Sequence, residues 1–288
     1  MAGLCWVTVM LVFFLSAENS LAAVDQNRLA EFVDGIREEY GIDKMFSLAV
    51  SIPENQNQTT GQILQQVFTS DPGNNVKNTI NNHKVYIGSR VVAAKVLERD
   101  TRGNSHAESR VLDNLHNLFN NNYFVNDMLL FYVYASPCKT CSSTNSKDGG
   151  MSILRRLFKI RQWHSYAVVF SKIFSPRSNS STTTMKPTTD PDERKQALQN
   201  LGTFKGDQGP IGLKNIFRCD RQNGSMQCTS CYNSLSLDNV TPYCYLDDTQ
   251  PQQSNRNDNF GQSSSDTGGR ASGGAGATGT VVAWGGKG

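Results

Sequence analysis

Hydrophobic and polar positions follow helical and strand periods in turn along the central part of the chain. Apolar residues at helical spacing predict a helix over residues 29–40, which Gly41 ends. Residues 46–52 and 84–97 are rich in Val, Ile and Ala and predict two strands. Between them, residues 55–82 are polar and interrupted by Asp-Pro-Gly, which indicates an insertion with room for one weak helix.

The alternation continues toward the C-terminus. Residues 106–119 have apolar positions at helical spacing, and residues 128–134 form an uncharged run of strand length, as in a strand buried on both faces. Further predicted elements are a helix over 151–160, a strand over 166–173, a helix over 190–201 and a last strand over 211–217. Alternating strands and helices imply one mixed or parallel sheet covered by helices.

Both ends of the chain depart from this pattern. Residues 4–15 form an apolar run that is shorter than the roughly 20 residues needed to span a bilayer. Small residues follow it, so we predict a signal peptide over residues 1–23, with a signal anchor or a buried helix as the alternatives. Residues 249–288 are rich in Gly, Ser, Asn and Gln and predict a disordered tail. The mature chain is therefore expected to be secreted and to have no membrane span.

Composition and charge further limit the classes of protein to which this chain can belong. The chain has 288 residues, 38% of them hydrophobic, which suffices for one or two domains with a sizeable core. A net charge of only +3 excludes a histone-like polycation, so nucleic-acid binding would depend on local patches. Four sequons are compatible with secretion and are candidate glycosylation sites: Asn57, Asn179, Asn223 and Asn239.

Two short motifs carry residues suited to a metal centre. His106 and Glu108 form a His-x-Glu motif at the start of a predicted helix, and Cys138 and Cys141 form a Pro-Cys-x-x-Cys motif directly after the most hydrophobic strand. Two cysteines three apart on a first helical turn can aim both sulfurs at one point, and the helix N-terminus favours their thiolates. One histidine and two thiolates leave an open fourth position at a tetrahedral zinc for water, whose pKa zinc lowers. Glu108 would then transfer protons.

Each motif has an alternative explanation. Cys138 and Cys141 could form a redox pair or a local disulfide, which an oxidising compartment favours. Neither option accounts for the His-x-Glu motif. Glu108 could be a solvated carboxylate at the start of a helix.

The paired motifs resemble the zinc-dependent nucleobase deaminases. The 28 residues between Glu108 and Pro137 are similar to the spacing in the AID/APOBEC polynucleotide cytosine deaminases, and Ser136 precedes the Pro-Cys pair as in that family. Residues 170–174 and 196–201 are similar to later segments of the family. The resemblance covers roughly residues 25–217, and with the signal peptide the chain is similar to the secreted AID/APOBEC-like deaminases.

The resemblance implies a three-layer, cytidine-deaminase-like α/β fold, with a mixed five-stranded sheet flanked by helices and its last two strands parallel. It also implies a secreted hydrolytic deaminase that converts cytosine to uracil in single-stranded DNA or RNA. His106, Cys138 and Cys141 would hold one zinc ion and Glu108 would be catalytic. The alternatives are a deaminase of free cytidine or adenosine, a catalytically silent extracellular nucleic-acid-binding or defence module, and a disulfide-stapled interaction protein.

Some segments depart from the family pattern. The family's tryptophan is missing from the region before Ser136, which holds Tyr134 and Ala135, so the substrate-facing wall does not carry over directly. Residues 142–150 resemble an insertion, and residues 175–189 are rich in Ser and Thr. The resemblance therefore does not predict which nucleotides next to the target cytosine this chain would prefer.

A basic segment indicates a nucleic-acid partner. Residues 151–177 contain six Lys or Arg residues and no Asp or Glu, with aromatic residues between them, as single-strand binding requires. The alternative is a solvated helix face with core aromatics, which we prefer for Trp163 and Tyr166. Asn104, just before the first motif, could contact sugar or base or could be a turn residue. The candidate contacts are Asn104, Arg155, Arg156, Lys159, Lys172 and Phe174.

The seven cysteines divide into three groups. Cys5 leaves with the signal peptide, and two cysteines belong to the metal motif. The other four lie in a predicted C-terminal extension, residues 219–248, that follows the deaminase domain, residues 24–218. They could hold a structural zinc, but a secreted chain favours two disulfides, with three pairings open. These cysteines are Cys219, Cys228, Cys231 and Cys244.

Overall fold

The structure is a computed structural model that describes residues 24–41, 45–97, 106–119, 126–144, 152–174, 190–206, 209–236 and 239–247. All of them belong to one compact unit of the chain, Met1–Pro251. The predicted signal peptide, the predicted tail and Asn104 lie outside the described residues. None of the helices in the described part combines the length and the apolar character that a bilayer crossing requires.

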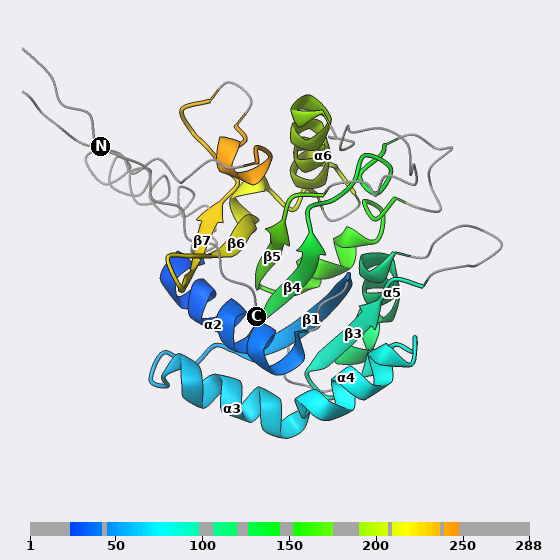
Figure 1. The fold of residues 1–288 in the computed structure, drawn as a ribbon, viewed down its shortest axis with the longest axis vertical. Helices are drawn as coiled ribbons and strands as arrows, with labels where there is room; N and C mark the ends of the chain where they lie inside the picture. The colour runs from blue at the N-terminus through cyan, green and yellow to red at the C-terminus, as the bar shows by residue number, and fades with distance from the viewer. Residues whose placement is uncertain are drawn as a thin grey trace, which may run out of the picture. The chain divides into compact units, whose positions relative to one another are not determined.

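The described strands form one seven-stranded sheet (Figure 1) in the order β2-β3-β1-β4-β5-β6-β7. The central strand β4 (Asp127–Ala135) pairs antiparallel with β1 (Phe46–Pro53) and parallel with β5 (Ser165–Lys172). β3 (Val91–Lys95) and β2 (Tyr86–Ile87) extend the sheet beyond β1, and β6 (Ile216–Gln222) and β7 (Ser225–Ser230) extend it beyond β5. The mixed sheet is confirmed.

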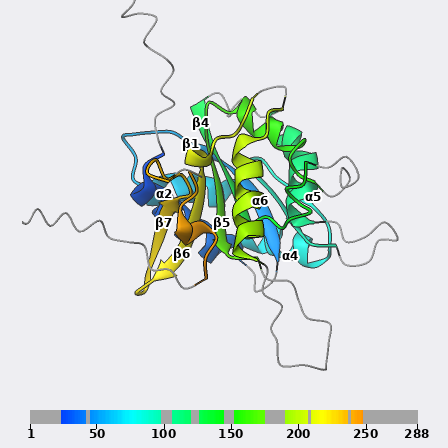
Figure 2. The same cartoon turned by 90° about the horizontal axis from the view of Figure 1, so that it is seen from above.

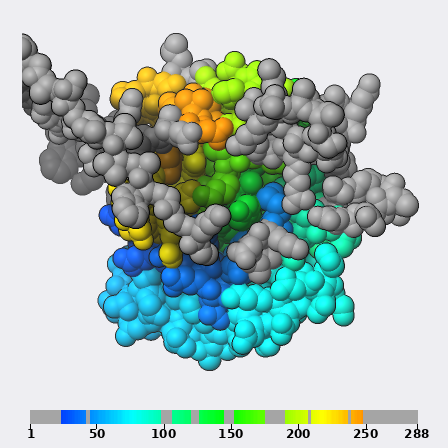
Figure 3. All heavy atoms as spheres, in the orientation of Figure 1, coloured from blue at the N-terminus to red at the C-terminus, as the bar shows by residue number. Residues whose placement is uncertain are grey.

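Helices cover both faces of this sheet. Seen from above in Figure 2, α2 (Gln26–Tyr40) lies on one side, and α5 (Ala107–Asn114) and α6 (Pro191–Thr203) lie on the other. One apolar cluster joins α2, α3 (Thr60–Ser70) and α4 (Gly73–Asn81) to the sheet, and a second joins α5 and α6 to it. In the space-filling view, the part of the chain from α2 to α4 forms one continuous area of the surface (blue to cyan, Figure 3).

Several predicted boundaries are confirmed and have local causes. Asp25 caps α2 by accepting from the amides of Asn27 and Arg28, and the helix ends before Gly41. Asp190 caps α6, whose first residue is the predicted Pro191. The uncharged run at residues 128–134 lies within β4, where all but one of the nine residues are buried.

The number of strands differs from the five that the resemblance implied. The predicted strand over 84–97 is two strands, because the turn between them wraps the buried carboxylate of Asp71. The amides of Ser89 and Arg90 donate to this carboxylate at 3.0 and 2.7 Å. Gly88 allows this approach, since a side chain there would clash with Asp71.

The second additional strand is β7, and it changes which strands come last. Residues Asn223 and Gly224 have φ values of 50° and 87° and turn β6 directly into β7. The predicted pair of parallel strands is confirmed, with Val168 opposite Ile216, but the final pair of the sheet, β6 and β7, is antiparallel. β6 also starts at residue 216 rather than 211, because the short 3-10 helix η5 (Leu213–Asn215) precedes it.

Three helix predictions differ from the structure. The polar segment 55–82 holds two helices, α3 and α4, because Thr59 and Gln62 form a capping box at α3 and Asp-Pro-Gly separates the helices. The predicted helix over 151–160 is, in its described residues, a turn followed by the 3-10 helix η4 (Leu157–Gln162). The predicted helix over 106–119 is α5 followed by the 3-10 helix η1 (Leu115–Leu118).

The four C-terminal cysteines form two disulfides. Cys219 and Cys228 face each other across β6 and β7, and Cys231 bonds to Cys244 near the 3-10 helix η6 (Pro242–Cys244). Sequence reasoning left three pairings open, and packing selects this one. β6 spans residues 216–222 and therefore crosses the predicted domain boundary at residue 218. The cysteine-rich segment completes the sheet in this way.

Candidate metal centre and active site

His106 and Glu108 lie at the N-terminus of α5, on the sheet face opposite α2. His106 is the N-cap residue, with extended φ and ψ of −64° and 143°, and Glu108 lies in the first turn. Val111 and Leu112 are buried and hold the helix against the sheet. Arg110 donates to the carbonyl of Lys95 at the end of β3 at 2.6 Å and ties the helix to that strand.

Cys138 and Cys141 lie in a single turn directly after β4. The amide and hydroxyl of Ser142 both donate to the carbonyl of Cys138, at 3.1 and 3.0 Å. The amide of Cys141 and the hydroxyl of Thr140 both donate to Cys138 Sγ, each at 3.1 Å. We call residues 138–142 the cysteine turn. It closes on itself through local hydrogen bonds.

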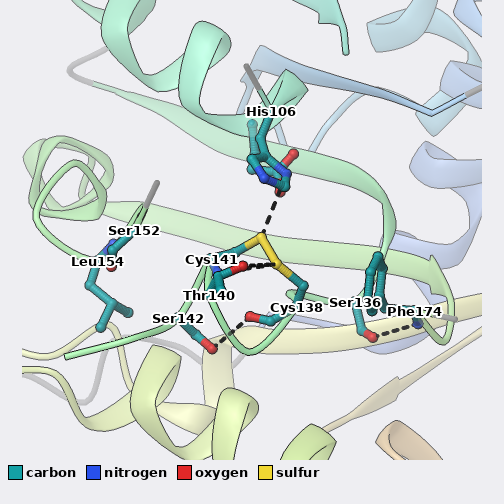
Figure 4. The surroundings of a disulfide bond; sticks show 10 residues. His106, Ser136, Cys138, Thr140, Cys141, Ser142, Ser152, Leu154 and Phe174 are labelled. Carbon is teal, nitrogen blue, oxygen red and sulfur yellow. Dashed lines mark hydrogen bonds and ion pairs between the residues drawn. A yellow bond between two sulfur atoms is a disulfide. The ribbon is translucent and has the colours of Figure 1, made fainter. Parts of the chain in front are cut away.

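The two predicted motifs meet in space although 31 intervening positions (107–137) separate His106 from Cys138. His106 Nδ1 lies 3.6 Å from Cys141 Sγ, and Figure 4 shows the imidazole directed at the cysteine turn. One donor atom from each of His106, Cys138 and Cys141 lies within 4.8 Å of the others. In this structure the two sulfurs are bonded to each other as a disulfide. The local disulfide that the sequence left open is thus present, and zinc binding would require its reduction, since thiolates are the ligands.

Glu108 is buried beside the three donor residues. It is only 6% exposed, and its Oε1 lies 3.7 Å from His106 Nδ1. Phe131, Val133 and Ala135 of β4 line a small apolar cavity with it. Burial raises the pKa of the Glu108 carboxyl, and the neighbouring His106 opposes part of this rise. These surroundings contradict the alternative of a solvated carboxylate.

Neighbouring segments hold the cysteine turn in place. Asn200 of α6 donates to the carbonyl of Ser142 at 3.0 Å, and the amide of Ile153 donates to the carbonyl of Cys141 at 2.8 Å. Ser136 joins the ends of β4 and β5, because its hydroxyl accepts from the amide of Phe174 at 2.9 Å. Sequence reasoning missed Asn200 and Ser142 as positioning residues, because no local pattern shows that α6 reaches the turn.

The family model described as Secreted Novel AID/APOBEC-like Deaminase 1 matches residues 26–247. The chain belongs to this family. None of the curated proteins matches the chain significantly. The match extends from α2 to beyond η6 and thus includes both motifs and the C-terminal disulfides. The resemblance found in the sequence and the prediction of a secreted protein are confirmed at the level of the family.

Three of the six candidate nucleic-acid contacts have side chains that bind other groups of the chain. Arg156 pairs with Asp113 at 2.8 Å, Lys159 donates to the carbonyl of Leu112, and Lys172 pairs with Asp220 at 2.7 Å. Trp163 and Tyr166 lie in the core, as expected of core aromatics. Arg155 is exposed and Phe174 is half-buried, whereas Asn104 lies outside the described residues. Nucleic-acid contact by these residues therefore stays a prediction.

Three of the four sequons belong to described residues, and all three asparagines are exposed. Two of them, at positions 223 and 239, have positive φ values of 50° and 54° in turns. The exposed sites are Asn57, Asn223 and Asn239. Asn179 lies outside the described residues. Exposure is compatible with glycosylation, which stays a prediction.

Proposed function

We propose that this member of the deaminase family is a zinc-dependent hydrolytic deaminase that converts cytosine to uracil in single-stranded DNA or RNA. The observation that carries the proposal is the convergence of the two motifs: a histidine, two cysteine sulfurs and a buried carboxylate share one site. Each residue type is the one that this chemistry uses.

The donor set of the site fits zinc. An imidazole nitrogen and two sulfurs within 4.8 Å of one another match a tetrahedral site with three protein ligands. His106, Cys138 and Cys141 would hold the ion once the cysteine pair is reduced. A zinc ion bound there would supply the Lewis acid that makes water nucleophilic near neutral pH.

Glu108 would move the protons of the reaction. Deamination forms a bond from water oxygen to C4 of cytosine and breaks the bond from C4 to the amino nitrogen, so protons must go from water to ring N3 and to the leaving ammonia. Burial raises the pKa of the Glu108 carboxyl, which favours its protonated form as a proton donor, and its ionised form accepts a proton. The apolar wall of β4 beside Glu108 strengthens these transfers, because a low dielectric strengthens local electrostatics.

The sheet supports a polynucleotide rather than a free nucleoside as substrate. α6 connects β5 to β6, and these strands are parallel, as the resemblance to the polynucleotide deaminases implies. A target base in such a substrate has to be unpaired or flipped to reach a buried carboxylate.

The test is metal content together with a cytosine-to-uracil assay on the secreted full-length protein, purified under reducing conditions with zinc. We expect about one zinc per chain and turnover of single-stranded oligonucleotides, which Glu108→Ala abolishes. Turnover of cytidine or adenosine alone would favour the free-nucleoside alternative. A fully zinc-loaded protein that leaves both oligonucleotides and nucleosides unchanged would contradict the enzyme. Binding without turnover, unaffected by Glu108→Ala, would support the silent binding module.

A further inference from the structure

The cysteine turn can exist in two mutually exclusive states. Its two sulfurs form a disulfide in this structure, with the Cα atoms 5.0 Å apart, well within the usual range of about 4.4–6.8 Å. The same two sulfurs are the metal donors of the proposed function. A sulfur in a disulfide has no thiolate charge to offer a metal ion. Only one state can therefore be occupied at a time.

We propose that Cys138 and Cys141 are a redox-active pair, and that thiol–disulfide exchange with small thiols decides whether the metal centre can assemble. The redox half of this inference rests on the observed disulfide, and the metal half rests on the proposed function. The co-reactants are low-molecular-weight thiols, such as glutathione, and their disulfides.

The turn keeps its shape without the sulfur–sulfur bond. Ser142 closes it through two hydrogen bonds to the carbonyl of Cys138. Asn200 and the amide of Ile153 hold it from outside. His106 belongs to another element, α5, and lies beside Cys141 at 3.6 Å while the disulfide is closed. Reduction therefore frees both sulfurs in a backbone that already presents them to His106.

The other two disulfides close longer loops and tie together larger parts of the fold. Cys219–Cys228 joins paired positions of β6 and β7, and Cys231–Cys244 lies in the apolar cluster on the α6 face. Their sequence separations are 9 and 13, against 3 for the cysteine turn. The stabilisation that a disulfide contributes increases with the length of the loop it closes. The bond in the cysteine turn is thus the one that reduction should open first.

Access directs the exchange to Cys138, which is 8% exposed, whereas Cys141 is 1% exposed. A thiolate attacks Cys138 Sγ and breaks the bond to Cys141, which leaves as a thiolate. A second thiolate attacks the outer sulfur of this mixed disulfide, forms the small-molecule disulfide and releases Cys138 as a thiolate. Two electrons pass to the cysteine pair, and the small thiols are oxidised. The hydroxyl of Thr140 and the amide of Cys141 both donate to Cys138 Sγ and stabilise that leaving sulfur.

The experiment is differential alkylation of the secreted full-length protein, read by peptide mass spectrometry, over a series of glutathione redox buffers with and without zinc. Zinc content is measured on the same samples. Without zinc and without thiol, we expect both cysteines of the turn to resist alkylation. With increasing thiol they should become labelled before the other four cysteines do. Protein reduced with zinc should retain the metal and resist closure of the disulfide on return to oxidising buffer.

Labelling of Cys138 and Cys141 in zinc-free protein without thiol would overturn the inference, and so would a turn that stays closed after the other disulfides have opened. If the reduced protein takes up zinc but its zinc-free form never closes the bond, the inference fails and the proposed function stands. If the pair opens and closes as expected but the reduced protein never retains zinc, the redox pair stands and the proposed function fails.

Thr140→Val tests the role of the hydroxyl donor. Loss of one hydrogen bond to the Cys138 thiolate should lower the equilibrium constant for reduction roughly three- to tenfold, and Thr140→Ser should restore it. Thr79→Val is a matched control, because its hydroxyl bonds only within α4, to the carbonyl of Asn75 at 2.8 Å. An unchanged equilibrium in Thr140→Val would refute this contribution of the turn.

Discussion

Replacement of Glu108 by glutamine tests whether its carboxylate is catalytic or only structural. Glutamine has nearly the same size but neither ionises nor transfers a proton. The position is 6% exposed and lines an apolar cavity, so the substitution leaves the packing in place. General acid–base catalysis contributes about 10²- to 10⁴-fold. We therefore expect turnover to fall by that factor, which corresponds to about 3–5 kcal/mol in the barrier.

The same substitution should stabilise the zinc-free, oxidised protein. Burial raises the pKa of Glu108 above its value in the unfolded chain, which is about 4.3. The native carboxyl thus contributes fully to stability below that pH, and the contribution is lost as the pH rises toward the raised pKa. Each pKa unit corresponds to about 1.4 kcal/mol, and 1 kcal/mol moves Tm by about 2–4 °C in a domain of this size. Glu108→Gln should therefore melt above the native protein at pH 7.5 and close to it at pH 4.

The assay is thermal unfolding at both pH values, together with uracil formation at pH 7.5. Glu31→Gln is the control, because Glu31 is exposed on α2 and its replacement should change neither quantity. Turnover at the native rate would refute the role in proton transfer. If the Tm of Glu108→Gln exceeds that of the native protein by no more at pH 7.5 than at pH 4, the reasoning from burial is refuted.

Three further predictions concern stability and processing. Asp127→Asn should destabilise the fold by about 3–5 kcal/mol in denaturant titrations, because it removes the negative charge that pairs, at 2.8 Å, with the buried guanidinium of Arg90. Replacing Cys231 and Cys244 together by alanine should cost about 3 kcal/mol in the same titrations, as expected for a loop of this length. Digestion with peptide-N-glycosidase should lower the mass of the secreted protein, and glutamine at each exposed sequon should remove one glycan: Asn57, Asn223 and Asn239.

Each of these predictions has its own control. Glu193→Gln breaks the pair between Glu193 and Lys139. These side chains are 39% and 71% exposed, so the variant should unfold close to the native denaturant concentration. An equal loss in Asp127→Asn and Glu193→Gln would contradict the distinction between buried and exposed pairs. If the double cysteine variant unfolds at the native denaturant concentration, that disulfide does not stabilise the fold. A secreted protein with unchanged mass after digestion would contradict glycosylation.

Local sequence patterns were sufficient to predict the helices and strands that depend on consecutive residues. The cap at Asp25, the Asp-Pro start of α6 and the uncharged run of β4 are properties of consecutive residues, and these elements form where the pattern predicts them. Two further local sequence signals mark elements that were not predicted. Asn223-Gly224 between two strand-like runs is a strong hairpin signal and would have predicted β7. Thr59 and Gln62 form a capping box that marks the start of α3.

Contacts between distant segments could not be predicted in this way. The break between β2 and β3 depends on the carboxylate of Asp71, which comes from the end of α3. The partners of the four C-terminal cysteines depend on the register of β6 and β7 and on the packing of the last segment. Register is a property of two strands, so neither strand's pattern specifies it alone.

For the candidate site, the sequence by itself determined the residue types and their spacing: a His-x-Glu motif, a Pro-Cys-x-x-Cys motif and the family to which they belong. The tertiary structure alone decided that His106 reaches the cysteine turn, that Glu108 is buried and that Cys138 and Cys141 are bonded. The reason is that α5 and the turn after β4 are distant in the sequence, and the sheet that carries both brings them together. Distance, burial and disulfide pairing arise from that packing and are not properties of either motif.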